Sequence, residues 1–202
     1  IVEIMDKHIK DNKKLLPKLR FKEFNNSEEW SYNNGDILFD TVANKNHKSD
    51  LPILAITQEH GAIPRDQIDY SVSVTEKSIE NYKVVEKGDF IISLRSFQGG
   101  IEYSQYKGIC SPAYIILRKK HEAETVDTFY KYYFKTRLFI KDLNKNLEGI
   151  RDGKMVSYQQ FSDLLLPSPS PNEQQKIADC LSSLDGLITA ENQKLESLKA
   201  HK

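Results

Sequence analysis

The sequence predicts an α+β fold, in which an irregular and mainly antiparallel β domain with a few helices is followed by a long C-terminal coiled-coil helix. Two patterns carry this prediction. Short apolar runs broken by glycines fill residues 36–117, as in short strands joined by turns. After Ser170, leucine and isoleucine recur every three or four residues, as in a helix with one narrow apolar stripe. We therefore expect a domain at 1–166, a proline and serine linker at 167–171 and a coiled-coil helix at 172–202.

The first half of the chain predicts an extended arm and then five short strands. The arm is residues 16–24, LPKLRFKEF, a basic and aromatic stretch without strong periodicity. The strands are apolar runs bounded by turn residues, and they cover 37–39, 53–57, 82–85, 90–94 and 114–117. Between the third and fourth runs, Lys87, Gly88 and Asp89 predict a turn of the chain.

Helical spacing replaces the strand pattern after residue 125. Asp127 is in position to cap a helix over 126–147, in which five apolar residues recur at helical intervals: Phe129, Tyr133, Phe134, Ile140 and Leu143. Such an aromatic stripe is more typical of a core than of a ligand pocket. A polar loop flanked by glycines, 149–154, precedes the stretch 156–166, which we expect to pack back onto the domain through Phe161, Leu164 and Leu165.

The C-terminal helix has a predicted start and a predicted partner surface. Residues 167–171, PSPSP, cannot be helical and predict a stiff linker, while Ser170, Pro171 and Glu173 fit a capping box with proline at the first helical position. The helix should therefore begin within a residue or two of Ser170. Its stripe occupies two positions in seven, with Glu191 at the one polar position, and consists of Ile177, Leu181, Leu184, Ile188, Leu195 and Leu198. A stripe this narrow is typical of a coiled-coil interface, and an isolated helix of this length needs a partner.

Composition excludes several classes of protein. With 202 residues, 39% of them apolar, the chain is long enough to bury one sizeable core. It has no apolar run long enough to span a bilayer, and we interpret Cys110 and Cys180 as buried thiols of a reducing cytoplasm. The five histidines are scattered and lack metal-ligand spacing. We therefore expect a cytoplasmic protein with no bound metal, no cofactor and no membrane partner.

Charge is neutral in total but uneven along the chain. The 29 basic and 29 acidic residues cancel, whereas proteins that bind nucleic acid usually carry a basic excess. Residues 25–90 hold six basic and twelve acidic residues, and residues 94–158 hold twelve basic and seven acidic ones. This asymmetry allows a basic face on a neutral protein. The alternative, that the lysines only solvate the surface, is equally open from charge alone.

No catalytic constellation survives inspection. Residues 111–114, SPAY, partly match the [NDS]-P-P-[YF] loop of adenine methyltransferases, but Ala113 replaces the second proline. Asp152 and Lys154 form an acid-x-lysine pair of the nuclease kind, without an evident second carboxylate to share a magnesium ion. The glycine pair at 99–100 stands alone before a β-type run, which is not the turn that holds a cofactor. The sequence therefore predicts a non-catalytic protein.

Four segments together resemble the specificity subunits of type I restriction-modification systems. They are LPKLRFKEF at 16–24, the Gly-Asp turn in VVEKGDFIIS, the strand SPAYIILR, and residues 149–188, where a polar glycine loop, a short amphipathic run, prolines and an EQQKI helix start follow one another. The resemblance covers about residues 16–202. It implies a target-recognition domain that binds double-stranded DNA, and a helix that holds two such domains apart so that a split site is read.

The resemblance also implies partners. The methyltransferase (modification) and restriction subunits of such systems are separate chains that carry the catalysis. Because the sequence shows no internal repeat, we expect it to hold one half of such a subunit. The other half is then a second copy in a homodimer, or a second half-subunit, bound through the C-terminal helix.

Reading DNA requires forked polar side chains on loops, with basic side chains nearby to hold phosphates. The predicted base-reading residues follow the strand at 90–94 and Pro64, and they are Arg95, Ser96, Gln98, Arg65 and Gln67. The predicted phosphate-binding residues are Lys107, Arg151 and Lys154. Each arginine also has a purely structural alternative, as the ion-pair partner of a neighbouring aspartate or as a brace within the β region.

Two other hypotheses stay open beside DNA recognition. The chain could be a coiled-coil protein-interaction module whose domain binds protein without DNA specificity, which zero net charge allows. It could also be an orphan methyltransferase or nuclease, which would require turnover by the isolated chain. Self-association does not separate the first two hypotheses, because both predict it through Leu181, Leu184 and Ile188. A DNA mobility shift in the presence of a cognate methyltransferase does.

Overall fold

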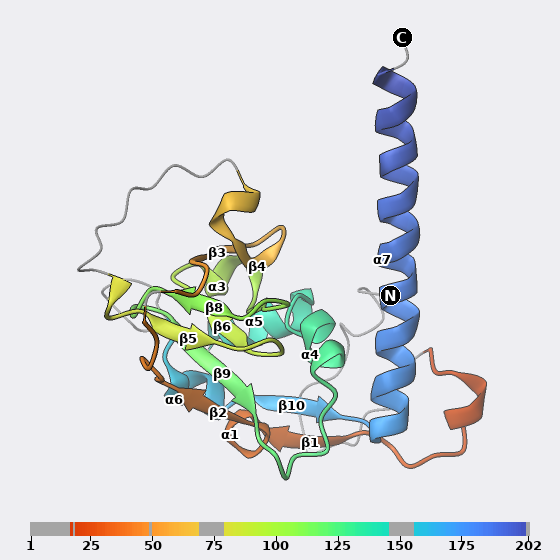
Figure 1. Cartoon of the computed structure of the whole chain (residues 1–202). Helices are drawn as coiled ribbons and strands as arrows, with labels where there is room; N and C mark the ends of the chain where they lie inside the picture. The colour runs from red at the N-terminus through yellow and green to blue at the C-terminus, as the bar shows by residue number, and fades with distance from the viewer. Residues whose placement is uncertain (1–16, 18, 49, 69–78, 146–155, 201–202) are drawn as a thin grey trace.

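The structure, a computed structural model, describes residues 17, 19–48, 50–68, 79–145 and 156–200. Four small antiparallel sheets and several short helices form a domain, and one helix of 30 residues runs beside the domain and then away from it (Figure 1). The predicted α+β class, with its long C-terminal helix, is confirmed. None of the helices in these ranges is long and apolar enough to cross a membrane.

The central sheet has four strands in the order β2-β9-β6-β7, all antiparallel. Their bounds are Phe39–Val42 for β2, Ile115–Lys119 for β9, Phe90–Ile92 for β6 and Glu102–Tyr103 for β7. Phe39 lies at the centre of the main core, and the rings of Phe90, Tyr130 and Phe161 pack on it edge to face with centroids 5.2–6.0 Å away. Such aromatic pairs add about 0.5–1.5 kcal/mol each to the burial of their area.

The other three sheets are strand pairs around this centre. They are β1 (Ser31–Asn34) with β10 (Leu165–Ser168), β3 (Leu54–Thr57) with β4 (Gly61–Pro64), and β5 (Lys83–Val85) with β8 (Gly108–Cys110). The turn predicted at Lys87–Asp89 is present, with the Asp89 amide donating to the carbonyl of Glu86. However, β5 and β6 on its two sides do not pair with each other. Each joins a different sheet, so this turn links two sheets and not two paired strands.

The stretch 126–147 forms two helices rather than one, α4 (Asp127–Tyr133) and α5 (Arg137–Lys145). Between them, Thr136 donates its amide to the carbonyl of Tyr133, three residues back, and its hydroxyl oxygen accepts the amide of Phe139. A threonine in this role caps a new helix. The expectation that Asp127 caps the first helix is also wrong, because Val126 occupies that position. The carboxylate of Asp127 instead accepts the hydroxyl of Tyr103.

Short helices complete the domain. They are η2 (Lys22–Phe24), α1 (Gly35–Leu38), η3 (Arg65–Gln67), α3 (Ser96–Gly99) and α6 (Tyr158–Ser162). The part of the predicted arm that the structure describes therefore ends in a helical turn. The stretch 156–166 packs back onto the core as expected through Phe161 and Leu164, while Leu165 is half exposed.

The predicted linker is part of the domain. Strand β10 ends at Ser168 and pairs with β1 in the register Tyr32 with Pro167. Pro167 has no amide hydrogen to donate, which an outer strand of a two-stranded sheet tolerates. Helix α7 (Pro171–Ala200) then begins one residue after Ser170, so the predicted helix start is confirmed. Pro169 and Ser170 alone thus separate the end of β10 from the start of α7.

Candidate nucleic-acid interface

The hairpin of β3 and β4 presents a polar tip of three residues, Gln58, Glu59 and His60, all exposed. The hydroxyl of Thr57 fixes the turn, since it accepts the His60 amide at 3.0 Å and donates to the Gly61 carbonyl at 3.1 Å. Gly61 has a φ of +72°, and a side chain there would lie 2.7 Å from the carbonyl oxygen of Tyr103. This turn is therefore open to glycine alone.

The hairpin tip lies against the α3 turn. The amide nitrogen Nε2 of Gln58 donates to the carbonyl of Arg95 at 3.4 Å, and a Cβ at Gly99 would meet the Gln58 side chain at 2.5 Å. The loop that follows β6 and the tip of the β3–β4 hairpin thus meet, although they are some forty residues apart in the sequence. This contact brings the side chains of Arg95 and Gln98, both exposed, to the same edge of the domain as Gln58.

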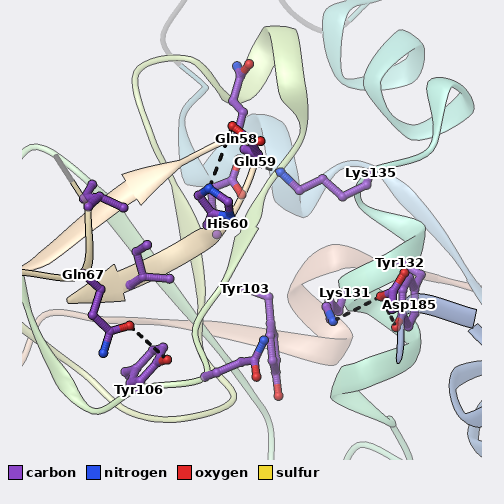
Figure 2. A pocket seen from close by; sticks show the side chains of 15 residues that line it. Gln58, Glu59, His60, Gln67, Tyr103, Tyr106, Lys131, Tyr132, Lys135 and Asp185 are labelled. Carbon is purple, nitrogen blue, oxygen red and sulfur yellow. Dashed lines mark hydrogen bonds and ion pairs between the residues drawn. The ribbon is translucent and has the colours of Figure 1, made fainter. Parts of the chain in front are cut away.

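A groove of about 700 Å³ opens between this hairpin and α7. One wall carries side chains of the hairpin, of η3 and of the loop after β7, and it includes Gln58, His60, Gln67, Gln105 and Tyr106. The opposite wall carries Lys131 and Tyr132 of α4, Lys135 of the turn after α4, and Asp185 of α7. Figure 2 shows the two sets of side chains facing each other, with Tyr103 between them. We call this site the polar groove.

The charged groups of the polar groove are largely neutralised in pairs. Lys135 lies 2.6 Å from Glu102, and Lys131 lies 3.8 Å from Asp185. Burial raises the pKa of Glu102 above its ordinary value, and the hydrogen bond and charge of Lys135 partly oppose this. The groove therefore presents mainly amides, phenols and an imidazole. Such groups suit hydrogen bonds to base edges better than the attraction of phosphates.

The structure brings several of the predicted base-reading residues together. Gln67 lines the polar groove, where its side-chain oxygen accepts the hydroxyl of Tyr106 at 3.3 Å. Arg65 belongs to the same short helix as Gln67 and is half-buried. Arg95 and Gln98 are exposed beside the hairpin tip. Arg65 and Gln67 thus lie in η3, Gln98 lies in α3 and Arg95 is the N-cap of α3, and both helices flank the hairpin.

Ser96 is the exception among them and corrects the prediction. It is 1% exposed, and its hydroxyl accepts the amide of Ser93 at 2.8 Å. The hydroxyl is used inside the turn that starts α3, so it is not presented to a ligand.

The structure does not bring the predicted phosphate-binding residues together as one group within the part of the chain that it describes. Lys107 is exposed and lies 2.8 Å from the carboxylate of Glu86, so part of its charge is already balanced. Arg151 and Lys154 lie outside the described residues. In their place, the structure offers Arg137 and Lys141, which are exposed one helical turn apart on α5. Helix α5 packs against α3. Both basic side chains therefore lie on the helix next to α3, which Arg95 precedes.

Of the residues that line the polar groove, sequence reasoning identified Gln67 alone. The residues that it missed on the hairpin side include Gln58, His60, Gln105 and Tyr106. A signal for the first two was present, because the polar letters QEHG separate two apolar runs, as in a hairpin turn. Gln105 and Tyr106 follow β7, a strand of two residues, and a run this short has no sequence pattern. Within the described ranges, no three histidine, cysteine, aspartate or glutamate side chains gather as a metal site would require.

The apolar stripe of α7 is divided between the domain and solvent. Ile177 packs against the main core, and Leu181 is half-buried. From Ser182 to Ala200 every residue is exposed, and the remaining stripe residues Leu184, Ile188, Leu195 and Leu198 are exposed by 43–62%. Four large apolar side chains in one line on a free helix are typical of a surface that a second helix covers. The coiled-coil interface itself remains a prediction.

Two solved structures share this fold. The S subunit of a type I restriction-modification system from M. genitalium aligns with 89% of this chain and 44% of its own, with a TM-score of 0.52 and 15% identity. A chain from a structural study of the assembly and conformational transition of the type I restriction-modification system aligns with 85% of this chain and 42% of its own, with a TM-score of 0.53 and 17% identity.

Sequence comparison leads to the same group of proteins. The MjaX type I restriction enzyme specificity subunit of Methanocaldococcus jannaschii is 28% identical over 120 residues, which are 59% of this chain and 27% of that protein. The chain thus spans less than half the length of each of these proteins. The family model described as the type I restriction modification DNA specificity domain matches residues 20–200. The chain therefore belongs to the family of type I restriction modification DNA specificity domains.

Proposed function

We propose that this chain is a non-catalytic DNA-recognition subunit, which reads one half of a bipartite duplex site for a type I restriction-modification system. The observation that carries the proposal is the arrangement around the polar groove. Neutral hydrogen-bonding side chains gather at one edge of the domain, and beside them α7 extends past the domain with an uncovered apolar stripe. Membership of the specificity-domain family supports the same function.

The side chains at this edge match the chemistry of base reading. Glutamine amides donate and accept together, which suits adenine in the major groove, and an arginine guanidinium suits guanine. Gln58, Gln67 and Gln98 supply amides, and Arg95 supplies a guanidinium. The turn with Arg95 and Gln98 meets the hairpin tip, whereas Gln67 lies in η3 at the other end of the hairpin and lines the polar groove together with Gln58. Phosphate contacts then come from exposed basic side chains around this edge, including those of Lys107, Arg137 and Lys141. Contacts of this kind fix the register of the protein on DNA without selecting its sequence.

The stripe of α7 favours an antiparallel partner helix of the same sequence. If Leu181 of one copy faces Leu198 of the other, Leu184 faces Leu195 and Ile188 faces Glu191, so all stripe positions from 181 to 198 find a counterpart. The twofold axis then passes between residues 189 and 190. At 1.5 Å per residue, the two copies of Ile177 stand about 38 Å apart, or roughly 11 base pairs, close to one turn of B-DNA. A twofold axis also makes the two half-sites inverted copies of each other.

The catalytic steps belong to other chains in this proposal. The paired helices expose polar faces on both sides of the stripe, where modification and restriction subunits can dock. Residues on these faces include Lys176, Asp179, Ser183, Gln193 and Lys194, all exposed. The domain then fixes which sequence is methylated or restricted, and the docked subunits carry out the chemistry.

One observation favours a second candidate, a coiled-coil interaction module without DNA specificity. The polar groove contains the carboxylates of Glu59 and Asp185, and carboxylates repel phosphates. In that case the groove would bind a protein segment, and pairing through α7 would be the main function of the chain.

Binding of a fluorescent random-sequence duplex, measured by anisotropy between 50 and 300 mM salt, separates the two candidates. The proposal predicts binding whose logarithm falls linearly with the logarithm of salt concentration, with a slope of about −3 to −6 for a few phosphate contacts per domain. An excess of the same duplex without label should compete fully. Absence of binding at the lowest salt, with or without a cognate modification subunit, contradicts DNA recognition and leaves the interaction module.

A further inference from the structure

Two polar side chains in the first turn of α7 are buried within the domain. Glu173 and Gln174 are 0% and 1% exposed, whereas the next residue, Gln175, is exposed. Polar side chains are buried only where partners replace water. Both residues do have such partners, and these partners lie on other elements of the fold.

Glu173 forms a two-point ion pair with Arg20, 153 positions earlier in the chain. Its two carboxylate oxygens accept Nε and Nη2 of Arg20, each at 2.7 Å. The guanidinium also donates to the backbone carbonyls of Ser27 and Glu28. This bidentate geometry fixes direction as well as distance, because both groups are planar. It ties the first turn of α7 to the segment around η2.

Gln174 ties the same turn to a second part of the domain. Its side-chain oxygen accepts the amide of Val126 at 2.8 Å, the residue that caps α4. Its side-chain nitrogen donates to the carbonyls of Pro169 at 2.8 Å and Glu124 at 3.2 Å. One carboxamide thus serves three backbone groups, at the start of α4 and at the start of α7. We call Arg20, Glu173 and Gln174 the α7 anchor.

Contacts farther along α7 are exposed and fewer. The hydroxyl of Tyr132 donates to Asp185 at 2.8 Å, and Lys131 lies 3.8 Å from the same carboxylate. Exposed pairs of this kind contribute little to stability. Nothing in the described part of the chain lies within 4 Å of a Cβ placed at Gly186. The direction of α7 therefore depends on the α7 anchor together with the packing of Ile177 and Ala178 on the main core.

We propose that Glu173 and Gln174 are positioning residues that fix the direction in which α7 leaves the domain, and thereby the length of DNA between two half-sites. The exposed part of α7, residues 182–200, is about 28 Å long at 1.5 Å per residue. Ala200 lies about 40 Å along α7 from the anchor at the same rise, so a tilt of about 10° at the anchor moves Ala200 by about 7 Å, more than the 3.4 Å rise of one base pair. The part of this inference that concerns DNA rests on the proposed function, but the part that concerns α7 does not.

The first test measures the direction of α7 without DNA. Nitroxide labels at Lys45→Cys on the domain and Ser197→Cys on α7, in a Cys180→Ser background, give a distance distribution by pulsed electron resonance. Labelled protein is diluted into unlabelled protein, so that only distances within one copy contribute. Gln174→Ala and Glu173→Gln should each broaden the distribution at least twofold. Gln175→Ala is the matched control, because its side chain is exposed and bonds only Asp179 within α7, and it should leave the width unchanged.

Unchanged width and centre in both anchor variants would overturn the inference. Glu173→Gln is isosteric and keeps an oxygen for one of the two bonds, so it decides the question if Gln174→Ala fails to fold, which circular dichroism would show. Broadening in the Gln175→Ala control to the same extent would also overturn it.

The second test uses duplexes that carry two half-sites, with spacers that differ by single base pairs. Wild-type protein should prefer one spacer over its neighbours by about tenfold, because one base pair changes both separation and rotation. Glu173→Gln should lower that preference to about threefold or less while affinity for a single half-site stays the same, a pattern that loss of folding does not produce. Equal spacer preference in the variant and the wild type contradicts the role of the anchor. Absence of half-site binding by the wild type contradicts the proposed function instead, and the distance measurement then still tests the anchor.

Discussion

The buried carboxylates of this protein differ in how completely they are paired. Asp89 holds Arg118 through two bonds of 2.7 Å, and Glu173 holds Arg20 in the same way. Glu102 has one oxygen on Lys135, and its other oxygen is buried without a hydrogen-bond partner in the described structure. A carboxylate in this state carries a cost of desolvation that its single partner does not fully offset. Glu102 therefore differs from the other two in its response to pH.

We expect Glu102 to make the protein less stable as pH rises. Its pKa is raised in the folded state, chiefly by burial, above the ordinary value of 4.5. The folded protein then binds the proton more tightly than the unfolded chain, so the contribution of Glu102 to the free energy of unfolding is greatest below pH 4.5 and falls as pH rises through the folded pKa. In Glu102→Gln this contribution is absent. Urea denaturation from pH 4 to 8 measures the difference, with Glu59→Gln at the exposed hairpin tip as control, and a wild-type advantage that grows with pH would contradict the assignment.

The two predicted kinds of DNA contact respond differently to substitution. Arg95→Ala and Gln98→Ala should lower the preference for the cognate half-site over other sequences by about tenfold each, as loss of a base contact does. Lys107→Ala should weaken cognate and random duplexes alike, and only by about twofold, because Glu86 already balances part of its charge. Competition anisotropy with both duplexes measures these ratios. The assignment fails if Lys107→Ala alters the preference or if both Arg95→Ala and Gln98→Ala leave it unchanged.

Among the secondary-structure elements, α7 allows the most direct test, because its apolar stripe is exposed beyond Leu181. Leu184→Asp with Ile188→Asp should raise the dissociation constant of the dimer by at least about 1000-fold, since four large apolar side chains lose their burial across the pair. The domain should unfold at nearly the same urea concentration, because both side chains are exposed and neither belongs to a core cluster of the described residues. Ser183→Asp, on another face of α7, is the control. Sedimentation equilibrium measures the effect, and an unchanged dimer would exclude the stripe as the interface.

The orientation of the paired helices has its own test. In the antiparallel register, Leu184 of one copy faces Leu195 of the other. A Leu184→Cys, Leu195→Cys double variant in a Cys180→Ser background should therefore form intermolecular disulfides on mild oxidation, while Leu184→Cys alone should not. A parallel pair in register would cross-link Leu184→Cys alone as well as the double variant, because each position then faces itself.

The sequence predicts elements well where an apolar pattern is strong. Strands β3, β6 and β9 and the start of α7 agree with the prediction within about two residues, because alternation, turn residues and capping residues all indicate the same element. The apolar pattern does not predict strands β1 and β10. The first reads SYNN, and the second contains Pro167, so only the pairing of distant segments makes them strands. The break between α4 and α5 likewise depends on Thr136, whose capping role is evident only once the chain turns there.

The candidate site is harder to predict than the fold. Gln67, Arg95 and Gln98 were identified as forked polar side chains on loops. The structure places Arg95 and Gln98 beside the hairpin tip and Gln67 in the lining of the polar groove. Ser96 looked equivalent in sequence, but its hydroxyl is enclosed by its own turn. Which polar side chains face outward depends on how short loops pack on one another, and a local pattern does not contain that information.

As a single body, the protein combines a domain with a helix that has a surface for another helix. The α7 anchor joins the two through buried bonds, and the polar groove lies between the hairpin and α7 (Figures 1 and 2). Any partner that pairs with α7 therefore stands in a defined relation to the edge of the domain that we propose reads bases. In the proposed function, recognition by each domain and the distance between two domains are set by different residues, which is what reading a split site requires.

Selection of bound duplexes from a fully random pool, followed by sequencing, tests this account most directly. The account predicts two identical half-sites in inverted orientation, separated by a non-selected spacer of constant length, with centres about one turn of B-DNA apart. The inverted order follows from the antiparallel pairing of α7, and the constant spacer from the rigid attachment of α7 to the domain. A single continuous motif, two half-sites in direct repeat, or no enriched sequence at all would contradict it.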